Sequence, residues 1–306
     1  MNQLLQTLLD SVTVGSLYGL IALGYTMVYG ILQFINFAHS DVFMMGAWFS
    51  FLISRRAGWT KETPPFWGAP LVLMASMAIC GAIGFTIERL AYKPLRKAPR
   101  LNVLITAIGV SLLIENTGQL PFAFGTQPQR MPSLIHDTVL FSIADVPFHV
   151  VDLLVIGVSL ALMVLLQWLV YGTKLGLGMR AVSHDTRVAS LMGIDVNRVI
   201  SFTFVIGSAL AAAAGFLFSM KYAGLNQPAD GTWVLLGLKA FVAAVVGGIG
   251  NVRGAVLGGL LIGILEQFGM AYLNTSLRDV YVFTLLIVVL LVRPAGILGK
   301  PIMEKV

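Results

Sequence analysis

Charged side chains are scarce in this chain. Asp, Glu, Lys and Arg together make up 11% of its 306 residues, against roughly 25% in ordinary soluble domains. So few charges exclude a soluble globular protein of this length, because such a fold needs a largely charged surface to stay in solution. Hydrophobic residues account for 57% of the chain and glycine for 32 residues. This composition predicts a protein whose solvent is mostly lipid.

The sequence also lacks the patterns of several site types. The single cysteine, Cys80, excludes an internal disulfide, and we expect a small buried side chain there. No phosphate-binding G-x-x-x-x-G-K-[ST] loop is present. Gly176-Leu-Gly-Met-Arg-Ala matches the weak dinucleotide fingerprint, but it follows an apolar run of membrane-spanning length instead of a strand. The four histidines show no zinc-ligand spacing: His39, His136, His149 and His184. We therefore expect no metal, no cofactor and no enzymatic activity.

Apolar runs predict the fold class. A bilayer core about 30 Å thick needs roughly 20 apolar residues in a helix. The chain therefore reads as an all-α, polytopic bundle of eight or nine transmembrane helices in a single domain over 1–306, with some helices broken or re-entrant. The runs occupy 12–30, 37–54, 68–88, 101–122, 150–171, 199–220, 233–247, 254–273 and 279–292.

Basic residues predict the orientation, because short cytoplasmic loops collect Lys and Arg. The segment 89–100 carries five basic residues and no acid, and 172–198 and the C-terminal tail are also rich in them. We therefore expect these segments and the C-terminus in the cytoplasm. This assignment makes the net charge of +6 an orientation signal and not a sign of nucleic-acid binding. The segment 122–148, rich in proline and β-forming residues, is expected to be external and to form a small hairpin lid.

The N-terminal part leaves two alternatives open. If 12–30 and 37–54 both span, the chain has nine spans and an external N-terminus. If the polar stretch 31–45 is re-entrant or broken, it has eight spans and an internal N-terminus, since irregular backbone at membrane depth needs cover from protein or a water-filled cavity. The nine-span arrangement places Arg55, Arg56 and Lys61 outside, against the charge rule.

The cytoplasmic segment 172–198 contains a candidate amphipathic helix of two to three turns. Asp185 is positioned to cap its start, and Gly193 to follow its end, where a positive φ favours glycine. Ala189 is small enough to allow close approach. Two interpretations remain: a helix lying on the membrane surface, or a peg that docks into a groove on a soluble partner. The expected apolar face consists of Ala181, Val188, Leu191 and Met192.

Ionisable and polar residues recur at membrane depth. Burying a charge there costs about 2.5–3.5 kcal/mol on insertion scales, so such residues face a partner or a cavity. They serve either structural hydrogen bonding or a polar translocation route. The candidates are Asn36, His39, Asp41, Glu115, Asn116, Lys239, Glu266 and Gln267.

Glycines four residues apart point to close helix packing. Gly254 and Gly258 form one such pair, and Gly259 and Gly263 form another. Small residues at this spacing let helix backbones approach each other. We expect packing rather than ligand binding at these positions.

Four segments together resemble one family. The N-terminal GSLYGLIALGYTMVYGILQFINFAHSD (15–41), the loop RAVSHDTRVASLMGI (180–194), FVAAVVGGIGNVRGAVLGG (241–259) and RPAGILG (293–299) are similar to the branched-chain amino acid ABC permeases of the LivH type. These blocks lie at both ends and in the middle, in the family's order. Urea and short-chain amide permeases share the same blocks, so the alternative substrates stay open.

The resemblance implies one membrane subunit of an ATP-driven importer in a bacterial inner membrane, working by alternating access. Its partners would be a second related permease, two cytoplasmic ATPases that use the ATP, and a periplasmic or lipid-anchored binding protein that delivers an amino acid. The loop similar to the family's ATPase-contacting loop would supply Arg180, Ala181, Asp185, Ala189, Gly193 and Ile194. Two other classes stay open: a stand-alone transporter or channel that moves protons through Asp41, Glu115 or Glu266, and an intramembrane enzyme, for which no residue constellation is recognisable.

Overall fold

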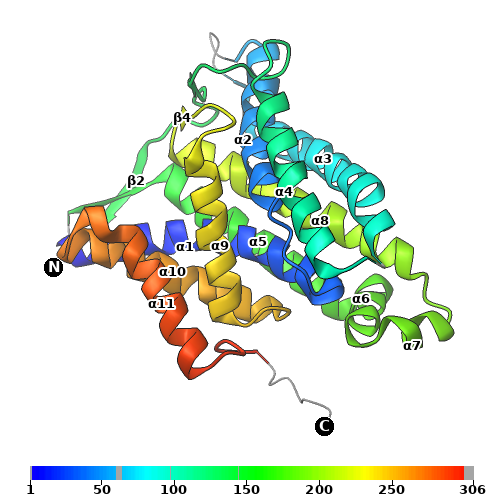
Figure 1. The fold of residues 1–306 in the computed structure, drawn as a ribbon. Helices are drawn as coiled ribbons and strands as arrows, with labels where there is room; N and C mark the ends of the chain where they lie inside the picture. The colour runs from blue at the N-terminus through cyan, green and yellow to red at the C-terminus, as the bar shows by residue number, and fades with distance from the viewer. Residues whose placement is uncertain (1, 60–63, 97, 144, 300–306) are drawn as a thin grey trace.

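The computed structural model describes residues 2–59, 64–96, 98–143 and 145–299, and helices dominate them (Figure 1). Within these residues, nine apolar helices coincide with the nine predicted runs, and the predicted all-α bundle is confirmed. The apolar helices are α1 (Asn2–Leu32), α2 (His39–Arg56), α3 (Gly68–Ile87), α4 (Arg100–Gly118), α5 (Val150–Gly172), α8 (Val196–Lys221), α9 (Gly231–Gly247), α10 (Val252–Tyr272) and α11 (Arg278–Val292).

Shorter elements connect them. Helices α6 (Lys174–His184) and α7 (Thr186–Leu191) fill the loop between α5 and α8. After α3 the chain continues as a π-helix, η1 (Glu88–Tyr92), and a 3₁₀ turn, η2 (Lys93–Leu95), and another 3₁₀ turn, η3 (Thr275–Leu277), precedes α11. The four strands are short: β1 (Gln129–Arg130), β2 (Val139–Ile143), β3 (Val146–His149) and β4 (Gly224–Leu225).

Length and composition make this a multi-pass membrane protein. Of the described helical segments, 7 are long and apolar enough to cross a bilayer, whereas α9 is shorter, with 17 residues, and α2 is not in this set. Helices α1 and α8 are largely buried and form the core, while α4 and α11 present mostly exposed apolar side chains. That outward apolar surface is what lipid covers in a membrane protein.

The two ends of the bundle carry different segments. At one end, the Asn2 side-chain amide donates to the Asp145 carboxylate over 3.4 Å, and β1 pairs with β4. At the other end, the Leu298 amide donates to the Gly247 carbonyl over 3.0 Å. The start of α1 therefore lies at the end that carries the segment 122–148, as the nine-span alternative requires.

The break that the eight-span alternative placed in 31–45 is present but shorter, and it occurs together with the N-terminal position of the nine-span alternative. Helix α1 continues to Leu32, and Gln33 then adopts a positive φ of 53°. Helix α2 restarts at His39, whose ring lies against Gly24 and Tyr25. Since Gly24 precedes the end of α1 by about 12 Å of helix, the chain turns back and starts α2 partway along α1.

This start decides how far Arg55 and Arg56 lie from the middle of the bundle, but it does not remove their exception to the charge rule. Helix α2 has 18 residues and is therefore about 27 Å long. A half-bilayer of hydrocarbon measures only about 15 Å. A helix that begins inside the bundle thus carries Arg55 and Arg56, both exposed, beyond the apolar layer; Lys61 lies outside the described residues.

Glycines line both sides of α10, as their spacing predicted. A Cβ on Gly259 would lie 2.5 Å from the Gly19 Cα in α1, and one on Gly263 would meet Gly15. On the opposite side, a Cβ on Gly258 would meet the backbone of Ala243 in α9. Helix α10 therefore contacts α1 and α9 backbone to backbone.

The expected hairpin and the expected buried thiol are also found. Strands β2 and β3 pair antiparallel, with Ile143 opposite Val146, next to the start of α1 in the sequence region predicted to be external. Cys80 is fully buried in α3. Helix α4 ends at Gly118, earlier than the predicted 122, because the chain turns there and the Phe124 amide donates back to the Gly118 carbonyl over 3.1 Å.

Candidate functional site

The loop between α5 and α8 folds as two helices, so the prediction of one amphipathic helix that includes Ala181 was wrong. Helix α6 ends at His184, and Asp185 has extended backbone angles of φ −155° and ψ 113°. This single extended residue changes the chain direction between α6 and α7. Ala181 therefore lies on α6, and Val188 lies on the separate helix α7.

Asp185 caps α7 as predicted. Its Oδ1 accepts hydrogen bonds from the backbone amides of Arg187 (2.7 Å) and Val188 (3.0 Å). These amides stabilise the ionised carboxylate and hold the pKa of Asp185 below its usual value. After α7, Gly193 has a φ of 83°, and the Ile194 amide donates to the Ala189 carbonyl over 3.1 Å. The two predicted helix signals are therefore confirmed.

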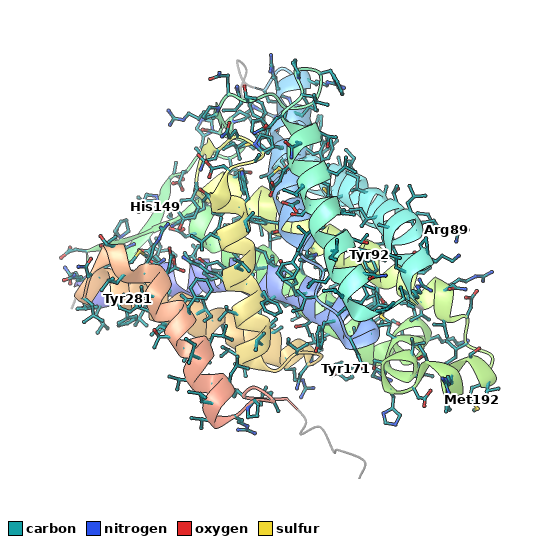
Figure 2. The ribbon with its side chains drawn as sticks, viewed as in Figure 1. Arg89, Tyr92, His149, Tyr171, Met192 and Tyr281 are labelled. Atoms are coloured by element: carbon teal, nitrogen blue, oxygen red, sulfur yellow. The ribbon has the colours of Figure 1, made fainter. Side chains whose placement is uncertain are left out.

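Helix α7 exposes apolar side chains at the edge of the molecule. Leu191 is 86% exposed, Met192 78% and Val188 54%, and Figure 2 shows Met192 at the tip of this region. Ala189 is buried in the chain's own core, so its side chain lies on the inner face. Of the other expected contact residues, Asp185 and Gly193 are exposed, and Arg180, Ala181 and Ile194 are half-buried.

Helix α6 is fixed to the end of α5. The Arg180 guanidinium bonds to the Val170 carbonyl and lies over the Tyr171 ring, 5.3 Å from its centroid. A cavity of about 440 Å³ lies between the α6–α7 turn and the end of α1, lined by Leu32 and Gln33 among others. The loop thus lies beside the break that precedes α2.

A first polar group surrounds the start of α2. His39 is buried, its Nε2 has no hydrogen-bond partner among the described residues, and its ring meets that of Tyr25 edge-on at 4.6 Å. Asp41 is fully buried, and the Ser111 hydroxyl donates to its Oδ2 over 2.5 Å. The Glu115 carboxyl on α4 lies next to it. These side chains are held where an α-helix presents its positive N-terminus.

Two separate hydrogen bonds, both made by side chains of η1, connect the break before α2 with the start of α8. The Tyr92 hydroxyl donates to the Asn36 Oδ1 over 2.6 Å. Tyr92 belongs to η1, which also carries the fully buried Glu88. Glu88 pairs with Arg96 and accepts from the Ser201 hydroxyl of α8 over 2.6 Å. A π-helical turn often marks a functional position, and this one connects α8 with the break before α2.

A second polar group lies between α1, α9 and α10. The Lys239 ammonium is 2.6 Å from the Glu266 Oε1, and the Tyr18 hydroxyl donates to the Glu266 Oε2 over 2.7 Å. The Asp279 Oδ1 lies 2.6 Å from the same ammonium. Glu266, Gln267 and Lys239 line a cavity of about 250 Å³.

The predicted route residues thus fall into two groups and do not line one cavity. Asn36, His39, Asp41 and Glu115 gather at the start of α2, and Glu266 and Gln267 line the second cavity. Asn116 belongs to neither group, because it is exposed and its side chain donates to the Leu112 carbonyl of its own helix over 2.7 Å.

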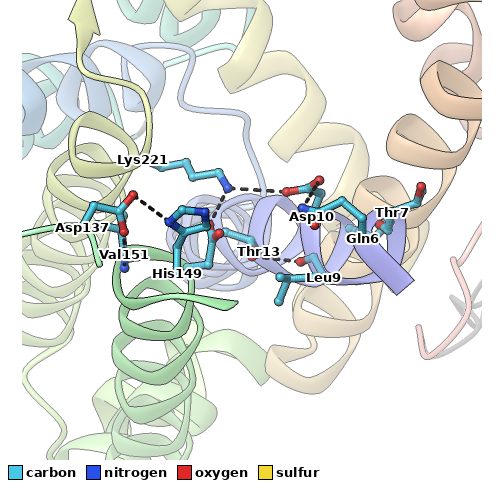
Figure 3. A network of polar contacts seen from close by, with 11 residues as sticks. Gln6, Thr7, Leu9, Asp10, Thr13, Asp137, His149, Val151 and Lys221 are labelled. Carbon is cyan, nitrogen blue, oxygen red and sulfur yellow. Dashed lines mark hydrogen bonds and ion pairs between the residues drawn. The ribbon is translucent and has the colours of Figure 1, made fainter. Parts of the chain in front are cut away.

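A third network was missed by the sequence reasoning. The Lys221 ammonium bonds to Asp152 and lies 3.5 Å from the Asp10 Oδ1, and the His149 Nδ1 lies 3.3 Å from Asp137 (Figure 3). These residues join the hairpin end of α1, α5 and α8. The sequence does show that these charged residues lie at the edges of apolar runs. It does not show which of them pair with each other, because they are far apart in sequence.

Comparison with known proteins identifies the family. Residues 7–291 match the family described as "Branched-chain amino acid transport system / permease component". The chain is 42% identical to the high-affinity branched-chain amino acid transport system permease protein BraD of Pseudomonas aeruginosa, over 99% of this chain and 98% of that protein. It is 43% identical to LivH of Escherichia coli, over 99% and 97% of the two chains.

More distant proteins extend the comparison. A probable branched-chain amino acid transport permease of Methanocaldococcus jannaschii is 30% identical over 92% of this chain and 88% of that protein. The expectation drawn from the four sequence blocks is therefore confirmed. The chain belongs to the family of permease components of branched-chain amino acid transport systems.

Proposed function

We propose that this chain is a membrane-spanning permease subunit of an ATP-driven importer that carries leucine, isoleucine and valine across a bacterial inner membrane. The observation that carries this proposal is identity of 42–43% over nearly the whole length to permeases named for this transport. The chain acts as one permease domain over 1–306. It is a transport component, so the proposal assigns it no catalytic residue and no cofactor.

The partners in this proposal are those that membership of the permease family implies. Two cytoplasmic ATPases bind and hydrolyse the ATP, in accord with a sequence that has no phosphate-binding loop of its own. A second related permease completes the membrane part, and a periplasmic or lipid-anchored binding protein delivers the amino acid. The C-terminus and the α6–α7 region lie on the cytoplasmic side, in accord with the basic residues of 89–100 and 172–198.

Helix α7 is the ATPase contact in this proposal. Its exposed Val188 and Leu191, with Met192 directly after the helix, form an apolar face suited to a groove on a soluble partner. Asp185 and Gly193 fix the two ends of the helix, so the face stays in one orientation. The expected role of Ala189 changes: its buried methyl group packs α7 against its own chain instead of contacting the ATPase.

Movement of α7 reaches the membrane interior through neighbouring contacts. Helix α8 follows α7 directly, and its Ser201 bonds to Glu88 beside Tyr92 and Asn36. We infer that the group at the start of α2 responds to the ATPases through this connection, while the second polar group lies on the path of the substrate. Alternating access then opens the path to one side at a time.

Uptake into proteoliposomes tests the proposal. The chain is reconstituted with the second permease, the ATPases and the binding protein, and labelled leucine uptake is measured with ATP inside. We expect ATP-dependent uptake that excess isoleucine or valine inhibits and excess urea or acetamide does not. Inhibition by urea or acetamide alone would assign the substrate to those classes. Uptake driven by a proton gradient in the absence of ATP and ATPases would replace the importer with a stand-alone transporter.

A further inference from the structure

The cavity beside Lys239 and Glu266 has the size of a single small molecule. Its volume of about 250 Å³ is that of roughly eight water molecules at about 30 Å³ each. It extends from the second polar group towards Tyr222 and Arg278, which lie at the end of α8 and the start of α11. In the orientation proposed above, the cavity therefore opens towards the external side.

We propose that this cavity binds one zwitterionic α-amino acid with a branched aliphatic side chain, with its carboxylate towards Lys239 and Arg278 and its ammonium towards Glu266. The inference rests on the proposed function and adds the residues that recognise the substrate.

The charged groups have unused hydrogen-bonding capacity. An ammonium carries three donors, and that of Lys239 has two carboxylate neighbours, Glu266 and Asp279, each at 2.6 Å. One donor is left for a ligand. The Glu266 carboxylate accepts one contact on each oxygen, from Lys239 and from Tyr18, and each oxygen keeps a further lone pair.

Charge balance selects the kind of ligand. Two cations, Lys239 and Arg278, face two anions, Glu266 and Asp279, so the group is neutral overall. Lys239 and Glu266 are only 2% and 5% exposed at their side chains, and an unbalanced charge added there is strongly disfavoured. A zwitterion brings one charge of each sign and leaves the total unchanged. A simple cation or anion does not.

The rest of the wall is apolar. Leu17, Ile21 and Phe43 are buried and line the cavity from α1 and α2, and Leu236 and Met270 line it from α9 and α10. Contact with these side chains stabilises an aliphatic group in proportion to the apolar area that it buries. Urea and short amides carry no group that fills this part, so the wall favours leucine, isoleucine and valine over them.

Substrate protection of a cysteine tests the site in the assembled transporter. Leu236→Cys places a thiol in the cavity, and the native Cys80 is buried, so the unsubstituted chain gives the background. A membrane-impermeant thiol reagent is applied from outside, and its modification of this chain is followed by mass. At leucine about ten times its dissociation constant, the rate should fall roughly tenfold, because only the empty cavity reacts. Ser142→Cys, on the exposed strand β2, should react equally with and without leucine.

A second variant tests the charges without leaving one unpaired. The double variant Lys239→Gln, Glu266→Gln removes the ammonium and the carboxylate charge together, and Asp279 keeps its contact with Arg278 at 3.5 Å. In the Leu236→Cys background, this pair should abolish protection by leucine and lower uptake at least several-fold. Lys221→Gln with Asp152→Asn removes an ion pair of the third network, outside this cavity, and should leave protection unchanged.

The outcomes separate the two proposals. If leucine is imported normally but does not protect Leu236→Cys, or protects it equally without the Lys239 and Glu266 charges, the cavity is not the binding site and the proposed function stands. If the unsubstituted transporter imports no leucine, the proposed function fails, and this inference fails with it.

Discussion

Replacing Gly259 by alanine adds one methyl group between two helix backbones. The new Cβ would lie 2.5 Å from the Gly19 Cα and 2.9 Å from the Gly15 carbonyl oxygen. Backbone atoms cannot rotate away as a side chain can, so α1 and α10 must separate along their shared surface. Overpacking of this kind costs about 3 kcal/mol at the upper end of its usual range. The better helix propensity of alanine returns about 1 kcal/mol, which leaves a net loss of about 2 kcal/mol.

The matched control is Gly157→Ala in α5. A Cβ there meets nothing within 4 Å, so only the helix-propensity gain of about 1 kcal/mol applies. Both variants add one methyl group to a transmembrane helix. Gly259→Ala should lose about 2 kcal/mol of stability and Gly157→Ala should gain about 1 kcal/mol, so the two should differ by about 3 kcal/mol.

Cys80 provides the assay. Its thiol is fully buried and is the only one in the sequence, so a thiol-reactive dye reports unfolding during a thermal ramp of the full-length chain in detergent. At roughly 2 °C per kcal/mol for a chain of this size, Gly259→Ala should melt about 4 °C lower and Gly157→Ala about 2 °C higher. Equal midpoints for the two variants would refute the proposed backbone contact between α1 and α10.

Substitutions at three further positions test other contacts. Asp185→Ala removes the cap of α7 and should lower ATP-driven leucine uptake, while Asp185→Ser should keep most of the uptake. Because backbone amides lower the pKa of Asp185, the cap is complete above the ordinary Asp pKa of about 3.9 and is lost only as the pH falls below that value. Small pH changes near neutral should therefore leave uptake unchanged through this group. Gly193→Val forces a β-branched residue to a φ of 83° and should uncouple ATP hydrolysis from uptake without loss of membrane insertion, whereas Gly193→Asn should be tolerated. Glu88→Ala leaves Arg96 without its buried partner and should destabilise the chain by about 3 kcal/mol in the Cys80 assay, with a smaller effect for Glu88→Gln; equal midpoints would show that the pair adds no stability.

Local signals predicted the helices well. Each of the nine apolar runs became a helix, because a membrane-spanning segment must satisfy its backbone hydrogen bonds internally. Asp185 and Gly193 marked the two ends of α7 for equally local reasons, since capping depends on neighbouring residues.

The geometry of α2 was harder to predict. The polar stretch after Leu32 indicated a break, but not that His39 would return to the level of Gly24. That return depends on a space beside a glycine in another helix, which periodicity does not report. The division between α6 and α7 was missed because Asp185 was interpreted as the start of one helix, whereas it also ends the helix before it.

The polar groups show which part of the candidate site the sequence could not predict. Glu266 and Lys239 were recognised as costly residues at membrane depth, but their contact joins residues 27 positions apart on different helices. Lys221 and Asp152 are separated by 69 positions. Pairing of this kind depends on which helices pack against each other, and the sequence of a single helix does not predict its neighbours.

The position of α2 has a consequence for biogenesis. Helix α2 is absent from the set of described segments apolar enough to cross a bilayer unaided, and it packs chiefly against α8. Helix α8 begins at Val196, 140 residues after α2 ends at Arg56. At about 5–20 residues per second, a ribosome needs roughly 7–28 s to synthesise that interval. During this time α2 lacks the helix against which it packs most, including the contact of Gly46 with Ala212, so the insertion machinery or the adjacent α1 must shelter α2 until the second half of the chain is made.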